Sequence, residues 1–200
     1  MVLSDRQIER YSRQIIAIGG IAQERLIAAR ITLAGEVADV EPVFDYLVGA
    51  GVGRINLRLV GEVQDRERLI ARAREVNPDA VEAGTPSNRP SAALLLVLAG
   101  SGPALALGAE LCAEAVGSPT VFARLDRPAK VVTIRNPPPY PAGVAAKLFA
   151  PYWYRSAAAG IVAMVAAVEA LKLLIADLPE LPASMIEFNG YETVGEARRR

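Results

Sequence analysis

Residues 31–60 read ITLAGEVADVEPVFDYLVGAGVGRINLRLV, and this stretch decides the fold. The apolar run at residues 31–34 predicts a short buried strand. Residues 43–48 predict a helix, with Pro42 acceptable in its first turn. Residues 54–60 alternate between apolar and polar side chains, which is typical of a second strand. The stretch therefore predicts a strand–helix–strand unit.

The same alternation continues along the rest of the chain. Further helices are predicted at residues 64–76, 103–116 and 157–176, and further strands at residues 80–83, 94–99, 120–124, 130–135 and 184–188. Strands that alternate with helices indicate a mostly parallel sheet with helices on both faces. We therefore expect one α/β domain over residues 1–200, Rossmann-like and doubly wound, with a possible antiparallel extension formed by the late strands.

The chain opens with two predicted helices. Ser4 is a plausible N-cap for the first one, which carries four large apolar or aromatic residues on one side. These residues are Ile8, Tyr11, Ile15 and Ile16. A second short helix is predicted at residues 23–29.

The composition excludes several classes of function. Lysine plus arginine and aspartate plus glutamate both number 22, so no basic footprint for nucleic acid or an anionic membrane surface is expected. The chain has no histidine, which excludes histidine-dependent catalysis and histidine metal sites. Cys112 is the single cysteine, so neither a disulfide within the chain nor a cysteine zinc cluster is possible. A cytoplasmic protein is expected.

Two long runs of the sequence carry no charged residue, and neither is suited to span a membrane. The run at residues 91–109 is broken by the Gly-Ser-Gly-Pro sequence at residues 100–103. The run at residues 157–168 is too short to span a bilayer before Glu169 interrupts it. Both runs are interpreted as buried core elements.

Three segments resemble those of a known protein family. RYSRQ at residues 10–14 and AQERL at residues 22–26 are similar to the opening of the ThiF, MoeB and HesA proteins of the ubiquitin-activating-enzyme-like superfamily. The stretch at residues 31–59, with AGVG at residues 50–53, is similar to their first strand–helix–strand unit. The segment AGIVAMVAAVEALKLL at residues 159–174 resembles their late helix. Together the segments cover about half of the chain.

The resemblance implies a division of the chain into three parts and a dimer. Residues 1–30 would be a helical dimerisation segment, residues 31–125 a nucleotide-binding core, and residues 126–200 late strands and a long helix. The relatives bind ATP at the first strand–helix turn and adenylate a protein carboxylate.

The glycine-rich turn that such chemistry needs is reduced here to Gly35. Val37 and Val40 place branched side chains where phosphate needs bare backbone. Three acids in the same stretch add negative charge where a polyphosphate would lie, namely Glu36, Asp39 and Glu41. We therefore interpret the chain as a degenerate member of this family that has lost ATP binding.

The other family contacts are altered too. The magnesium-binding aspartate expected after the central strand is replaced by Gly100, Ser101 and Gly102, which favour a tight turn; a small-anion site is the alternative. The second strand ends without the ribose-binding acid. Arg66 or Arg68 could stand near the position of the family's lysine, although a solvated helix face explains both. No zinc pair is present, and Cys112 is interpreted as a small buried residue.

One family element is retained. The resemblance implies that Arg13 reaches across a dimer towards the nucleotide of the partner subunit, as an arginine finger supplied in trans. The alternative is a structural salt bridge within the dimer or with Glu9. The resemblance implies three kinds of partner: a second copy, an intact ThiF/MoeB-like relative, and a ubiquitin-like or sulfur-carrier protein.

Two smaller features of the sequence are candidates for contacts with a partner. The Pro-Pro-Pro-Tyr run at residues 137–140 matches a WW-domain ligand, although a rigid loop explains it. Tyr152, Trp153 and Tyr154 form an aromatic cluster suited to a partner contact or to the edge of the core.

Three hypotheses for function follow. The first is a non-catalytic dimerising or partner subunit. The second is an active adenylyltransferase of a ubiquitin-like or sulfur-carrier protein, with a rebuilt pocket for ATP and magnesium. The third is a module that binds a small molecule or a peptide.

Overall fold

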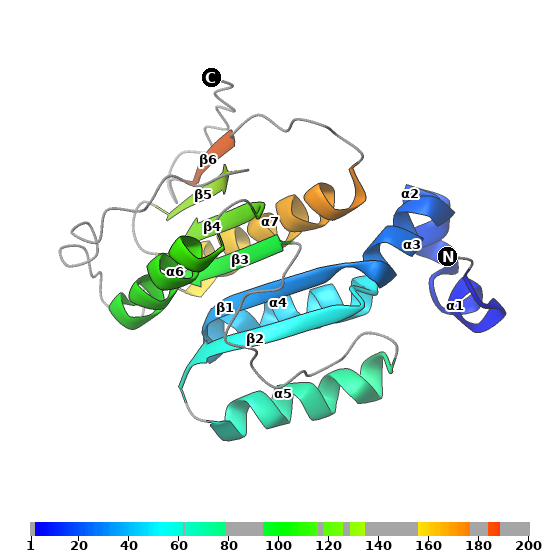
Figure 1. The fold of residues 1–200 in the computed structure, drawn as a ribbon, viewed down its shortest axis with the longest axis horizontal. Coiled ribbons are helices and arrows are strands. Elements are labelled where there is room, and N and C mark those ends of the chain that lie inside the picture. The colour runs from blue at the N-terminus through cyan, green and yellow to red at the C-terminus, as the bar shows by residue number, and fades with distance from the viewer. Residues whose placement is uncertain are drawn as a thin grey trace.

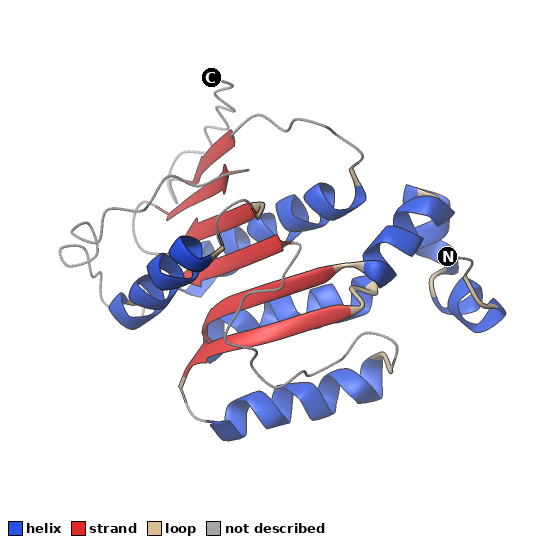
Figure 2. Cartoon of the chain, viewed as in Figure 1, coloured by secondary structure: helices blue, strands red, loops and turns tan. Residues whose placement is uncertain are grey.

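Within the described part of the chain the sheet has six strands and is covered by helices on both faces (Figures 1 and 2). The structure is a computed structural model that describes residues 3–61, 63–78, 94–115, 118–125, 129–134, 156–176 and 184–188. Its helices are α1 (Asp5–Arg10), α2 (Ser12–Ile18), α3 (Gly20–Ala28), α4 (Val37–Ala50), α5 (Val63–Val76), α6 (Gly102–Glu114) and α7 (Ser156–Ile175). Its strands are β1 (Arg30–Glu36), β2 (Arg54–Val60), β3 (Leu94–Ala99), β4 (Thr120–Arg124), β5 (Ala129–Ile134) and β6 (Ser184–Phe188).

The strand order is β2-β1-β3-β4-β5-β6. The first four strands in this order are parallel, and β5 and β6 are antiparallel to their neighbours. This arrangement confirms the expected Rossmann-like sheet and its antiparallel extension. Of the features predicted from sequence, the strand at residues 80–83, the loop at 137–140 and the aromatic cluster at 152–154 lie outside the described residues.

Two apolar layers sandwich the sheet because its central strands are apolar on both sides. All six residues of β3 are buried, as a fully covered parallel strand requires. One face of the sheet packs against α4, α5 and α7, and the other face packs against α6. Figure 1 shows α6 in front of the sheet and α4 and α7 behind it.

Helix α4 is longer than the sequence predicted. It begins at Val37 rather than near residue 43, so Pro42 lies inside the helix instead of in its first turn. The missing N–H of this proline costs one backbone hydrogen bond. Complete burial of Val40 and Phe44 on one helix face offsets that cost, because each buried side chain contributes about 1.5–3 kcal/mol.

The first predicted helix is two helices in the structure. Ser4 caps α1 through a capping box with Gln7, as expected. The chain turns at Tyr11, which is buried, and α2 then begins in a new direction. The prediction that these four residues share one apolar side of a single helix is therefore wrong. Ile8 is 47% exposed and Ile16 is 86% exposed.

The long uncharged runs form elements that pack against the core, as predicted, although Ile161 and Val168 of the second run are 47% and 39% exposed. The first forms β3, a turn and the start of α6, and the second lies in α7. No helix among the described residues has the length and apolarity needed to cross a membrane.

Candidate functional site

The candidate site is the switch point at the carboxyl ends of β1 and β3, where the strand order of an open parallel sheet creates a crevice. The chain leaves β1 towards β2 on one side, and it leaves β3 towards β4 on the other. Ligands of open parallel sheets bind at such a switch point. Both α4 and α6 begin there, so the N-termini of two helices, with their positive dipole ends, point at this crevice.

Gly35 lies at the end of β1 with a backbone φ of 153°. A Cβ atom at this position would lie 2.5 Å from the carbonyl oxygen of Leu98 and 3.2 Å from a methyl group of Val40. The close approach of β3 and α4 therefore requires glycine here. This packing accounts for the retained glycine without any phosphate.

The carboxylate of Asp39 lies against Gly100. A Cβ atom added at Gly100 would overlap Oδ2 of Asp39. Asp39 belongs to the first turn of α4, where the helix dipole favours a negative charge, and Gly100 directly follows β3. The structure thus brings together the two segments that the sequence singled out. Their meeting point holds an acidic side chain of the protein itself.

Glu36 and Ser101 occupy the N-cap positions of the two helices. The Ser101 hydroxyl accepts a hydrogen bond from the N–H of Ala104 at 3.3 Å, and Gly102 is the first residue of α6. This cap favours the tight-turn interpretation of the Gly-Ser-Gly sequence. Glu36 is half-buried and forms no such side-chain cap on α4.

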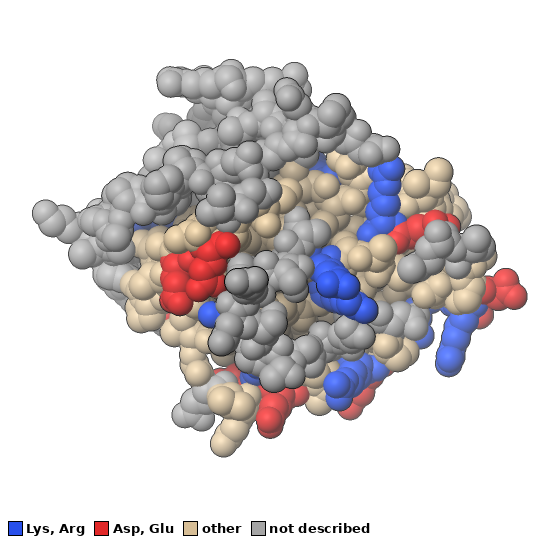
Figure 3. All heavy atoms as spheres, viewed as in Figure 1, with Lys and Arg blue, Asp and Glu red and all other residues tan. Residues whose placement is uncertain are grey.

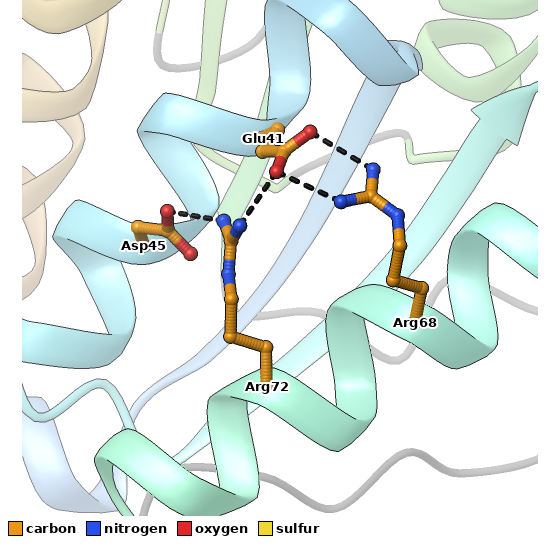
Figure 4. A network of polar contacts seen from close by, with 4 residues as sticks. All are labelled: Glu41, Asp45, Arg68 and Arg72. Atoms are coloured by element: carbon orange, nitrogen blue, oxygen red, sulfur yellow. Dashed lines mark hydrogen bonds and ion pairs between the residues drawn. The ribbon is translucent and has the colours of Figure 1, made fainter.

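Glu41 lies outside the crevice, which corrects its sequence assignment. Its carboxylate accepts hydrogen bonds from Arg68 at 2.9 and 3.0 Å and from Arg72 at 2.6 Å (Figure 4). Arg72 also donates to Asp45, so the four side chains join α4 to α5. Arg68 is therefore part of this network rather than a phosphate contact.

The network shifts the pKa values of its members. The hydrogen bond from Arg68 is the main cause that lowers the pKa of Glu41, burial opposes it, and the bond from Arg72 lowers it further. The bond to Glu41 raises the pKa of Arg68, and the bond to Asp45 raises the pKa of Arg72. Half of the Arg68 side chain is exposed, so the network is a surface one of modest stability.

Acidic and basic side chains alternate over the face shown in Figure 3. The described residues on this face form no continuous basic area. This pattern agrees with the equal numbers of the two charges in the chain.

Arg13 lies far from the crevice of its own chain. It is an exposed residue of α2, and α3 leads into the amino end of β1 (Figure 1). The crevice is at the other end of the same strand, about 20 Å away for seven residues. Within the described ranges Arg13 forms no ion pair with Glu9.

The family-like motif residues hold the N-terminal helices onto the end of α4. Gln14 donates to the carbonyl of Gly49 at 3.0 Å, and Gln23 donates to the carbonyl of Ala50 at 3.1 Å. Gly51 follows with a φ of 86°, and a Cβ atom there would collide with Tyr11 and Gln23. The RYSRQ and AQERL motifs therefore have a structural role, because both contact the end of α4.

Asn77 is a buried polar residue directly after α5 that the sequence analysis did not single out. Its amide donates to the Tyr11 hydroxyl at 2.6 Å and to the Val48 carbonyl at 2.9 Å. It also accepts from Arg10 at 2.9 Å. The only sign of this role in the sequence is that an asparagine directly precedes a proline, and a turn explains that pattern equally well.

The first segment contacts the end of the helix that carries the third segment. Arg25 donates to the carbonyl of Ile175, which directly follows the third segment and is the last residue of α7, at 2.8 Å. A cation at this position also complements the helix dipole. The AQERL part of the first segment therefore holds both the end of α4 and the end of α7.

The structure also bears on the predicted role of Cys112 and on metal binding. Cys112 is buried in α6, and burial raises its thiol pKa to about 11, as expected for a packing residue. Among the described residues no group of three or more acidic or cysteine side chains could hold a metal ion.

Comparison with protein-family models and with curated proteins gives no match. Solved structures do match. Escherichia coli MccB with succinimide has a TM-score of 0.65 and 16% identity, over 95% of this chain and 71% of MccB. The E. coli MccB structure with ATP has a TM-score of 0.63 and 16% identity, over 95% of this chain and 70% of MccB. PaaA has a TM-score of 0.61 and 14% identity, over 98% of this chain and 75% of PaaA.

At these identities the likeness shows the fold. The chain has the ThiF-like fold that the three sequence segments implied.

Proposed function

We propose that this chain is a ThiF/MoeB-like protein that has lost ATP binding and serves as a non-catalytic partner subunit. It would dimerise through its N-terminal helices with a second copy or with an intact ThiF/MoeB-like relative. In the latter case Arg13 would enter the ATP site of the relative. A ubiquitin-like or sulfur-carrier protein would then be the shared substrate.

The observation that carries the proposal is the position of Asp39. Its carboxylate lies against Gly100, between the two helix N-termini where a nucleotide phosphate would be expected. A phosphate placed about 4 Å from this carboxylate would be repelled by about 4 kcal/mol at an effective dielectric constant of 20. That repulsion corresponds to a loss of affinity of about a thousandfold.

A second argument concerns the turn itself. A phosphate cradle needs backbone N–H groups that point outward from a glycine-rich turn. Here the single glycine of the turn, Gly35, packs directly against the backbone of Leu98. The next residues, Glu36 and Val37, carry the chain directly into α4.

The experiment is a thermal-shift titration with ATP and magnesium, made on the wild type and on Asp39→Asn. The wild type should show no shift at millimolar nucleotide. Asp39→Asn removes the charge at nearly constant size, so weak nucleotide binding should appear if repulsion is the cause. A clear shift for the wild type would refute the proposed loss of ATP binding whatever the variant does.

The partner role is tested separately with an intact relative in the same reaction. Adding the wild-type chain should raise the rate of ATP–pyrophosphate exchange by the relative, and Arg13→Ala should abolish that increase while still forming the complex. Equal stimulation by both proteins would show that Arg13 has no role in the partner's site.

A second candidate is an active adenylyltransferase with a rebuilt pocket for ATP and magnesium. The observation in its favour is the fold shared with MccB, a ThiF/MoeB-like adenylyltransferase that has also been solved with ATP. This candidate requires the Asp39 side chain to leave Gly100 when nucleotide binds. The same titration separates the two, because only this candidate predicts a shift for the wild type.

A further inference from the structure

A polar strip runs along the face of β1 and β2 that lies opposite α4. Side chains alternate between the two faces of a strand, and Thr32 pairs with Asn56 across the two strands. Arg58 follows two residues later on the same face, beside Ala34, which belongs to the core under α6. The α4 side of these strands is apolar and carries residues such as Leu33. Because α4 lies behind β1 and β2 in Figure 1, the strip of Thr32, Asn56 and Arg58 is on the face towards the viewer.

Two oxygen atoms of the strip are buried without a hydrogen bond. Thr32 is 1% exposed, and neither its hydroxyl Oγ1 nor Oδ1 of Asn56 has a partner within the described part of the chain. The two residues are neighbours on strands about 4.8 Å apart. Folded proteins rarely leave buried polar groups unpaired, because each such group lowers stability. Apolar side chains of the same size would be more stable here, so a role other than packing accounts for the two polar residues.

Arg58 gives the strip a positive charge. It is half-buried and forms no hydrogen bond or ion pair in the described ranges, whereas Arg68 of α5 pairs with Glu41. Glu36 lies further along β1 on the same face, and no ion pair joins it to Arg58. A partly buried guanidinium whose donors have no partner is suited to bind a carboxylate.

The three side chains together suit two groups of one small molecule. Oδ1 of Asn56 only accepts hydrogen bonds, whereas the hydroxyl of Thr32 both donates and accepts, so a ligand hydroxyl can bond both. Arg58 follows Asn56 by about 6.6 Å along the strand, a distance that a small carboxylic acid and the long arginine side chain can bridge. The same face begins with two further arginines, Arg30 and Arg54, which disfavour a ligand ammonium group.

We propose that the polar strip binds a small hydroxycarboxylate. The guanidinium of Arg58 donates hydrogen bonds to its carboxylate. Its hydroxyl donates to Oδ1 of Asn56 and accepts from the hydroxyl of Thr32, so both unpaired oxygens gain a partner. The inference does not depend on the proposed loss of ATP binding, because these contacts come from the middle of the strands and no nucleotide takes part.

Calorimetric titration with lactate and with malate tests the binding. Each acid has matched analogues: propionate and succinate lack the hydroxyl, and alanine and aspartate carry an ammonium group in its place. At least one hydroxy acid should bind saturably at millimolar concentration, and its two analogues should bind about tenfold or more weakly. Absence of binding by both hydroxy acids would overturn the proposal. Equal binding of the analogue without the hydroxyl would overturn it too, because the unpaired oxygens would then have no part in the contact.

Arg58→Leu tests the contact with the carboxylate. The variant should bind the hydroxy acid about tenfold or more weakly, since it loses a charge-assisted hydrogen bond. Arg58→Lys keeps the charge and should recover part of the affinity. The control Arg74→Leu removes an exposed arginine of α5, on the other side of the sheet, and should leave binding unchanged. Undiminished binding by Arg58→Leu would contradict the assigned position of the carboxylate.

Thr32→Val separates binding from folding. Because the hydroxyl has no partner in the chain, the variant should unfold at the same or a higher urea concentration than the wild type. It should nevertheless bind the hydroxy acid about tenfold more weakly, and Asn56→Leu should act in the same way. A clear loss of stability in Thr32→Val would show that the hydroxyl serves the fold, and undiminished binding by the folded variant would show that it does not touch the ligand; either result would refute the site.

Discussion

Replacing Asn77 by alanine should weaken the attachment of the N-terminal helices to the body of the protein and lower its stability. Asn77 is 2% exposed, and its side chain bonds Tyr11, Val48 and Arg10. Alanine leaves the buried Tyr11 hydroxyl and the Val48 carbonyl without this donor. Each buried polar group that loses its partner costs about 1–3 kcal/mol, so the loss for the two groups is about 2–6 kcal/mol.

Urea unfolding measures the loss, and Tyr11→Phe provides the matched comparison. Phenylalanine removes the hydroxyl and leaves the bond from Asn77 to Val48 intact, so its cost should be about 1 kcal/mol. The double variant should cost less than the sum of the two, since the first change already removes the shared bond. A loss below about 0.5 kcal/mol for Asn77→Ala would refute the reasoning.

The remaining predictions concern single sites in the core and on the surface. Gly35→Ala should lower stability by about 2 kcal/mol or more through the clash with β3, whereas Gly49→Ala, in open space on α4, should raise it by about 0.5–1 kcal/mol; urea unfolding checks both. Glu41→Gln should lower stability by at most about 1 kcal/mol at neutral pH and low salt. The pKa of Glu41 is lowered in the folded state, so this contribution is present above its ordinary value of 4.5 and is lost as the pH falls through the folded pKa. Unfolding of the wild type and the variant should therefore converge in acid. Cys112, with a pKa of about 11, should resist alkylation at neutral pH until the protein is unfolded.

The sheet could be predicted from sequence because its strands are bounded by sharp changes of composition. The predicted bounds of β2, β3 and β4 agree with the structure, since each is an apolar or alternating run. The start of α4 was misplaced because Pro42 is a typical first-turn residue and lies deeper in this helix. That error also misassigned Glu41, since a helix that begins at Val37 turns Glu41 towards α5.

The sequence was sufficient to predict which residues form the candidate site, but it did not predict which of them contact one another. Glycine loss and added acids are visible in the sequence around residue 36. The contact between Asp39 and Gly100 joins segments far apart in the chain, and no spacing rule connects them. The buried position of Asn77 was hidden for the same reason, because its three partners come from α1, the turn after it and α4.

Calorimetric titration of the purified chain with ATP and magnesium tests the central claim most directly. The proposed function predicts no heat of binding up to millimolar nucleotide, because the Asp39 carboxylate beside Gly100 would repel a phosphate at this position. Saturable binding at micromolar ATP would contradict it and would favour an adenylyltransferase with a rebuilt pocket.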